Sequence, residues 1–138
     1  MDNYSRLEYK EILMWTLEKA EGFENCFKKF SKKHAVEARA VMANLETFIS
    51  VLNATNNVQQ TKQLNFVRKE PEGVVALDSS GAPREKKNTK LKATRLYVYA
   101  VEINSTLYLL RIGDKDSQPQ DLKRCKQLVK QIRGACRL

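Results

Sequence analysis

The amino-acid sequence predicts a single α+β domain, in which helices pack on a mainly antiparallel β-sheet. In chain order, the spacing of apolar residues predicts an N-terminal strand, a helical hairpin, a three- to four-stranded sheet and a C-terminal helix. The 138 residues, 42% of them apolar, are enough to bury one core and too few for two. We therefore expect one domain over residues 9–133, with a basic insertion at about 79–94 and tails at 1–8 and 134–138.

The first part of the chain is expected to supply one strand and the helical hairpin. Residues 9–15 form a short aromatic and apolar run, which is typical of a buried strand. Thr16 is expected to cap a first helix over residues 17–32, where alanine and phenylalanine recur at helical spacing. Gly22 lies inside that helix, at a cost of about 1 kcal/mol relative to alanine. A second apolar stripe predicts a second helix that ends near Leu52.

Two strands and a basic loop are expected next. Residues 63–68 form a short strand candidate, and a turn at 70–73 separates it from a β-branched strand at 74–77. Turn-forming residues follow at 78–83. The segment 84–94 is rich in lysine and arginine, and such a run either repels itself into disorder or binds phosphates.

A β-hairpin and a helix are expected to complete the domain. Residues 95–103 and 106–112 are strand-like and flank a two-residue turn at 104–105. The sequence Ser-Gln-Pro-Gln at 117–120 matches a capping box, which predicts the start of a helix. The apolar face expected for this helix consists of Leu122, Cys125, Leu128, Val129 and Ile132.

The excess positive charge lies in the second half of the chain. Residues 61–138 contain 17 Lys or Arg and 8 Asp or Glu, which accounts for the whole net charge of +9. This distribution indicates a phosphate-rich or acidic partner, with nucleic acid as the leading class and a solvated lysine-rich surface as the alternative. The residues expected to contact RNA are Arg84, Lys86, Lys87, Lys90 and Lys92 in the basic segment and Lys123 and Arg124 in the last helix.

Metal, cofactor and histidine chemistry are not expected. The three cysteines lack Cys-x-x-Cys spacing, and with His34 as the single histidine they do not form a familiar zinc ligand set. His34 lies in a basic run beside an expected helix start, where a histidine is normally solvated. The sequence contains neither a phosphate-binding nor a dinucleotide-binding glycine motif. No apolar run approaches the roughly 20 residues that cross a bilayer, and the start does not resemble a secretory signal, so we expect a cytoplasmic protein.

Two segments around the hairpin resemble a known family. Residues 95–99 read Arg-Leu-Tyr-Val-Tyr, and residues 109–119 read Leu-Leu-Arg-Ile-Gly-Asp-Lys-Asp-Ser-Gln-Pro. With the order of elements, they resemble the RelE/ParE superfamily of small bacterial toxins, most closely its HigB and phage-derived branch. Members similar to RelE cut messenger RNA, usually on the ribosome, by activating the ribose 2′-OH against the adjacent phosphate. The resemblance covers residues 9–133 and implies an antitoxin protein as partner and no cofactor.

The resemblance also implies roles for particular residues. Arg95 takes the place of the strand arginine that contacts the scissile phosphate, and Lys115 takes that of the basic residue after the glycine. Arg111 is expected on the same face of the sheet. Tyr97 and Tyr99 are candidates for base stacking or proton transfer, with packing in the core as the alternative. Positive charge in such a site would stabilise the phosphorane-like transition state without a histidine.

The strand at 74–77 departs from the family's pattern. Val74, Ala76 and Asp78 stand where RelE has basic residues, which leaves nuclease activity open. The basic insertion is expected to supply the phosphate contacts that this strand lacks. The alternatives are a topoisomerase inhibitor similar to ParE and a catalytically decayed module that binds nucleic acid or an acidic partner.

Overall fold

The computed structural model describes residues 14–81 and 91–136 of the chain. Two short 3₁₀ turns lie at Pro71–Gly73 and Glu102–Asn104. The other helices and strands, in chain order, are β1 (Thr16–Lys19), α2 (Phe23–Lys33), α3 (Ala35–Thr55), α4 (Val58–Thr61), β2 (Val67–Lys69), β3 (Val75–Leu77), β4 (Thr94–Val101), β5 (Thr106–Asp114) and α5 (Gln118–Ala135).

The strands form one mixed sheet in the order β1-β5-β4-β3-β2. β1 pairs parallel with β5, whereas the other neighbouring strands pair antiparallel. The parallel pair is possible because a long connection, which includes α2 and α3, separates the two strands in the chain. The prediction of an α+β domain with a C-terminal helix is confirmed.

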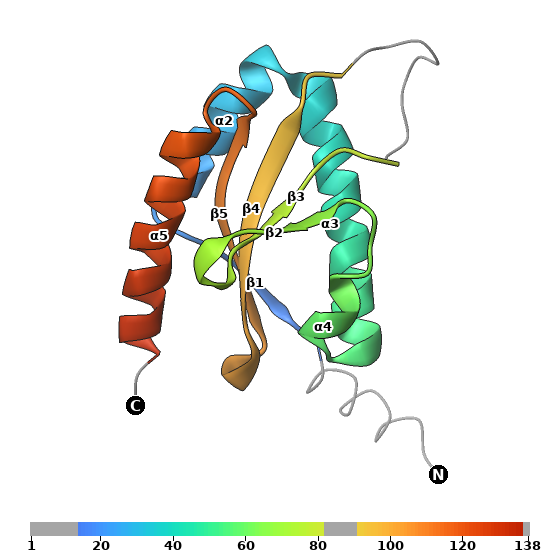
Figure 1. The fold of residues 1–138 in the computed structure, drawn as a ribbon, viewed down its shortest axis with the longest axis vertical. Coiled ribbons are helices and arrows are strands. Elements are labelled where there is room, and N and C mark those ends of the chain that lie inside the picture. The colour runs from blue at the N-terminus through green and yellow to red at the C-terminus, as the bar shows by residue number, and fades with distance from the viewer. Residues whose placement is uncertain (1–13, 82–90, 137–138) are drawn as a thin grey trace.

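Helices cover both faces of this sheet. Figure 1 shows α3 on one side of the sheet and α5 on the opposite side. Buried residues of the larger core, between the sheet and the α2–α3 pair, include Phe23, Phe30, Val41, Phe48, Leu52, Leu96 and Leu107. The smaller core, under α5, contains Val74, Ala76, Tyr97, Leu110, Cys125, Leu128 and Val129. Neighbouring residues of β4 therefore point to opposite cores, as the alternation of a strand requires.

The beginning of the chain differs from the sequence prediction. Residues 9–13 of the expected first strand lie outside the described residues, and β1 occupies Thr16–Lys19, where we expected a helix. The Trp15 indole donates a hydrogen bond to Asn56 Oδ1 (3.0 Å), which anchors Trp15 on the end of α3. The chain then runs beside β5, and Gly22, with φ of 84°, ends this extended stretch just before α2. Gly22 thus stands at the helix start, in the left-handed conformation that glycine tolerates, and not in the helix interior.

The middle of the chain matches the prediction in part. β3 is confirmed, but the strand expected at 63–68 is reduced to Val67–Lys69, and the short helix α4 was not predicted. α3 extends past Leu52 to Thr55 before Asn56 takes a left-handed conformation. The hairpin is confirmed as β4 and β5.

The hairpin contains two local features that the sequence did not reveal. The expected two-residue turn is instead the 3₁₀ turn Glu102–Asn104 followed by Ser105 in a left-handed conformation. A bulge also interrupts the register, because Tyr97 lies opposite Arg111 while Val98 lies opposite Leu109. The extra residue lets both Leu110 and Arg111 face the α5 side of the sheet.

The C-terminal helix begins where the sequence predicted, but its capping box does not form. Ser117 stands at the N-cap, yet its side chain accepts no hydrogen bond from the first turn of the helix. The hydroxyl donates instead to Asp121 Oδ2 (2.7 Å). Cys125, Leu128 and Val129 are buried as expected, whereas Leu122 and Ile132 are only partly buried.

None of the helices in the described part of the chain combines the length and the apolar character that a membrane span requires.

Candidate nucleic-acid interface

An open groove runs between the C-terminal end of α2, the last residues of β5 and the first turn of α5. Its volume is ≈ 640 Å³. We call it the α2–β5 groove. Its basic lining comes from three segments of the chain and consists of Lys29, Lys32, Lys33, His34, Lys92 and Arg111. Two carboxylates, those of Asp114 and Asp121, also line it.

The groove exists because α2 replaces a missing strand beside β5. β1 pairs with β5 only as far as Leu109, which leaves the end of that edge without a strand partner. Cys26 of α2 fills this position: its thiol donates to the carbonyl oxygen of Ile112 (3.1 Å) and accepts from the Ile112 N–H (3.5 Å). The last turns of α2, with their lysines, are thereby held beside the end of β5.

Arg111 is the arginine of the groove, and it is held by a buried carboxylate. Its Nε lies 3.7 Å from Asp121 Oδ1, and the side chain is 30% exposed. Burial raises the pKa of the Asp121 carboxyl, although the Ser117 hydroxyl and Arg111 act in the opposite direction. The Nε of Arg111 is itself buried and makes no hydrogen bond to any described residue. Asp121 therefore holds Arg111 in place, and the exposed part of the Arg111 side chain lines the groove.

Lys92, one of the predicted RNA contacts, lines the groove and forms ion pairs with two aspartates. Its Nζ lies 3.2 Å from Asp114 Oδ2 and 3.8 Å from Asp116 Oδ2. Burial favours the protonated form of Asp114, but the Ser117 N–H and Lys92 outweigh it and lower the pKa of this carboxyl. The backbone N–H of Lys92 also donates to Glu37 Oε2 (3.2 Å). These contacts fix the segment before β4 against the groove.

His34 lies in the groove between α2 and α3, whereas the sequence predicted a solvated side chain. Its Nδ1 is 3.8 Å from Glu37 Oε2, and the side chain is 25% exposed. The imidazole also packs on Phe30, with ring centroids 5.0 Å apart. Sequence reasoning missed this residue and the α2 lysines as site residues. The dense basic run at 28–34 was the one signal that could have indicated them.

The residues implied by the family resemblance are only partly brought together. Arg95 lies opposite Gly113 on β4, is half-buried and does not line the groove. Its Nη1 donates to the carbonyl oxygen of Thr94 (3.1 Å), and its buried Nε makes no hydrogen bond to a described residue. Lys115 is exposed in the turn before α5 and likewise does not line the groove.

The two tyrosines lie away from the groove lining. Tyr97 is fully buried under α5, and this burial raises the pKa of its hydroxyl far above the ordinary value. The Tyr99 hydroxyl accepts a hydrogen bond from Arg133 Nε (3.1 Å), and the guanidinium carbon lies 5.8 Å from the ring centroid. Tyr97 is thus a core residue, and Tyr99 belongs to a separate contact between β4 and α5.

The other predicted RNA contacts fall into two groups. Lys123 is exposed on α5, and Arg124 donates to Gln127 Oε1 (3.2 Å); neither lines the groove. The remaining predicted contacts lie outside the described residues and are Arg84, Lys86, Lys87 and Lys90.

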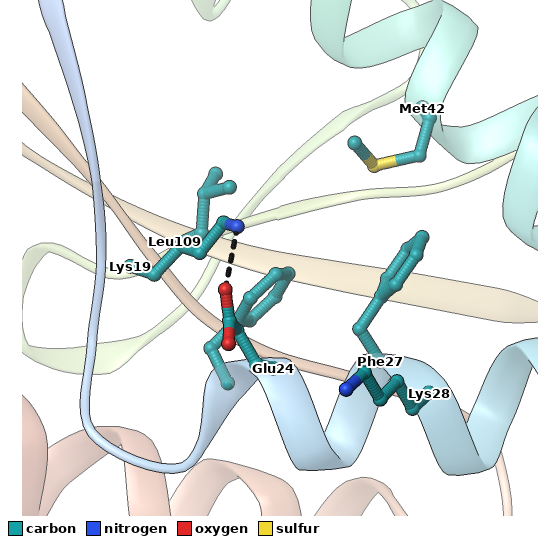
Figure 2. Close-up of a pocket in the computed structure, with 7 residues that line it drawn as sticks. Lys19, Glu24, Phe27, Lys28, Met42 and Leu109 are labelled. Atoms are coloured by element: carbon teal, nitrogen blue, oxygen red, sulfur yellow. Dashed lines mark hydrogen bonds and ion pairs between the residues drawn. The ribbon is translucent and has the colours of Figure 1, made fainter.

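A second cavity, of ≈ 330 Å³, has a different chemical character. Figure 2 shows Phe27 and Met42 beside an ion pair between Lys19 and Glu24, whose Nζ and Oε1 are 2.8 Å apart. Most of the remaining lining is apolar, and one of the two lysines that line the cavity is neutralised by the ion pair. This cavity is less suited to a polyanion than the α2–β5 groove.

Within residues 14–81 and 91–136, no group of three or more metal-binding side chains is close enough to hold an ion. No protein-family model, curated protein or solved structure matches the chain. The resemblance to the RelE/ParE superfamily therefore stays a prediction.

Proposed function

We propose that this chain is an RNA-cleaving toxin that binds single-stranded RNA along the α2–β5 groove. The observation that carries the proposal is that the acidic side chains of the groove are in ion pairs, whereas three of its lysines form none with the described residues. Both lining carboxylates are engaged, Asp114 by Lys92 and Asp121 by Arg111. Lys29, Lys32 and Lys33 form no ion pair with any described residue, so their charges remain for a ligand.

Several lysines without an ion-pair partner among the described residues suit a polyanion better than a small ligand. Each backbone phosphate that a cation neutralises releases condensed counterions, which favours binding at low salt. RNA is preferred over a single phosphate compound because the groove is open and its cations come from α2, from Lys92 and from β5. An acidic antitoxin covering the same groove is the protein partner that this charge would attract.

Cleavage is assigned to the neighbourhood of Arg111. In the proposed reaction the ribose 2′-OH attacks the adjacent phosphate, and negative charge builds up on the phosphorane oxygens. A guanidinium that is already held in place stabilises this charge without reorganisation. Asp121 and β5 hold Arg111 in that way, and Arg95 stands on the neighbouring strand.

A binding module without chemistry is the second candidate. It is favoured by the surroundings of β3, where the family's pattern would place cations. Val74 and Ala76 are buried in the smaller core, and Asp78 is paired with Arg68, its Oδ2 lying 2.8 Å from Nε. β3 therefore presents no cationic side chain to RNA.

The test incubates the purified protein with an end-labelled single-stranded RNA and with the same RNA carrying 2′-deoxy sugars. We expect cleavage of the RNA alone, with 2′,3′-cyclic phosphate ends. Arg111→Lys keeps the charge beside Asp121 but loses the guanidinium fork, and should lower kcat by about 10²-fold or more. RNA binding without cleavage would support the second candidate, and absence of both would contradict the proposal.

Expression in bacteria distinguishes a ribosome-dependent toxin from a topoisomerase inhibitor. Growth arrest with new message ends, seen by primer extension and lost in Arg111→Lys, is the expected result. Arrest with intact messages would indicate a topoisomerase-type target instead.

A further inference from the structure

His34, which lines the α2–β5 groove, faces the carboxylate of Glu37 on α3. Glu37 Oε2 lies 3.8 Å from His34 Nδ1 and accepts a hydrogen bond from the Lys92 N–H (3.2 Å). Glu37 is therefore fixed from two sides, by its own helix α3 and by the segment before β4. Phe30 packs against the imidazole and limits its rotation.

We propose that His34 takes the proton from the ribose 2′-OH, and that Glu37 is the positioning residue that orients the imidazole. This inference rests on the proposed function, because it assigns a role within RNA cleavage. A carboxylate facing Nδ1 favours the tautomer that carries its proton there, which leaves Nε2 as the acceptor. An imidazole with a carboxylate facing its other nitrogen is a common form of general base.

The other proton-transfer groups near the groove are less suitable. Tyr97 is fully buried, and its pKa is raised by that burial. Asp121 is buried and bound by Ser117 and Arg111. The Cys26 thiol is used by the backbone of Ile112. His34 combines partial exposure with a basic nitrogen that no described residue occupies.

The proposed step conserves atoms and charge. The 2′-OH proton moves to Nε2 of His34 as O2′ forms a bond to phosphorus. The bond from phosphorus to O5′ breaks, its electron pair stays on O5′, and a water molecule in the open groove protonates this oxygen. The resulting hydroxide removes the proton from the imidazolium, so His34 is regenerated. The products are a 2′,3′-cyclic phosphate and a 5′-hydroxyl.

Chemical rescue tests the role of the imidazole directly. We expect His34→Ala to lower kcat by about 10²-fold or more while the Kd for RNA stays within about twofold. Added free imidazole should restore cleavage by His34→Ala in proportion to its concentration. His34→Gln, which fills the same space, should be inactive and should not respond to imidazole. Lys126→Gln, which changes a lysine outside the groove, is the control that should cleave at the wild-type rate.

Glu37→Gln tests the positioning role separately. The amide oxygen can still accept from the Lys92 N–H, so folding is preserved, while the charge facing Nδ1 is lost. We expect kcat to fall by about tenfold with an unchanged KM.

Each result bears on the proposal. Cleavage by His34→Gln within threefold of the wild-type rate, or failure of imidazole to restore folded His34→Ala, would overturn the role of His34 and leave the proposed function in place. Absence of cleavage by the wild-type protein, both of free RNA and of messages in expressing bacteria, would overturn both.

Discussion

The carboxylate of Asp121 lies against the Cα atom of Gly113, so that no side chain fits at this position of β5. A Cβ atom built on Gly113 would overlap Asp121 Oδ2 and Ser117 Oγ. This close approach brings the first turn of α5 onto the end of β5 and forms one wall of the groove. The glycine that the sequence places before Lys115 thus has a steric reason.

Gly113→Ala should destabilise the protein by about 1–3 kcal/mol, because Asp121 and the start of α5 must move to admit a methyl group. Gly134→Ala is the matched control, since nothing lies within 4 Å of a Cβ atom there. It should leave the free energy of unfolding unchanged or raise it slightly. Urea unfolding of both variants measures the difference, and equal stabilities would contradict the close packing of α5 on β5.

Asp78→Asn should lower stability at neutral pH by about 1–3 kcal/mol. Burial acts to raise the pKa of Asp78, but hydrogen bonds from Arg68 and the Ser80 N–H outweigh it and lower this pKa. A depressed pKa means that the carboxylate stabilises the folded state above pH 3.8 and loses this contribution as pH falls through the folded-state pKa. The difference in the free energy of unfolding between wild type and variant should therefore disappear in acid.

The control for Asp78 is Glu72→Gln. Glu72 pairs with Arg133 at 3.1 Å, but both side chains are about half exposed. Such a pair should change the free energy of unfolding by less than about 1 kcal/mol. If the stability difference between wild type and Asp78→Asn did not depend on pH, the ionised carboxylate of Asp78 would not be what stabilises the fold.

Cys26→Ala should destabilise the protein by about 1–2 kcal/mol, because the N–H and carbonyl of Ile112 lose their partner at the edge of β5. Cys26→Ser, which can donate and accept, should recover part of this loss. Cys136→Ser, near the end of the chain, serves as the control. If Cys26→Ala and the control unfolded at the same temperature, Cys26 would not stabilise the edge of β5 by bonding the Ile112 backbone.

The basic insertion supplies a further prediction on RNA. Replacing Arg84, Lys86, Lys87 and Lys90 by glutamine should reduce the salt dependence of RNA binding. The slope of log K against log[salt] should be lower by about 0.7 for each phosphate that the variant no longer neutralises. Binding measured by fluorescence anisotropy over a range of salt gives this slope. An unchanged slope would make the insertion a surface loop without a role in binding.

The hairpin could be predicted from the sequence because its pattern is local. Residues 95–103 and 106–112 carry the alternation of a strand within themselves, and α5 carries its own apolar stripe and start signal. β1 could not be placed in this way. Its strand conformation depends on the parallel partner β5, far along the chain, and on Trp15 being anchored by Asn56.

Only some of the groove residues could be predicted from the sequence, for a similar reason. Arg111 could be predicted because it lies in the hairpin that carries the family-like motif, and Lys92 because it lies in the basic segment before that hairpin. Lys29, Lys32, Lys33 and His34 were not, because their role depends on α2 packing against the edge of β5. The contact that decides this packing joins Cys26 to Ile112, 86 residues apart, and no local pattern reports it.

The measurement that most directly tests the central claim compares RNA binding by two double variants of equal charge. Lys32→Gln/Lys33→Gln removes two cations from the groove, whereas Lys126→Gln/Lys130→Gln removes two from a separate cavity on α5. We expect the groove variant to bind more weakly, with a salt slope lower by about 1.4, and the α5 variant to keep nearly the wild-type slope. Equal losses in the two variants would contradict an RNA-binding site in the α2–β5 groove.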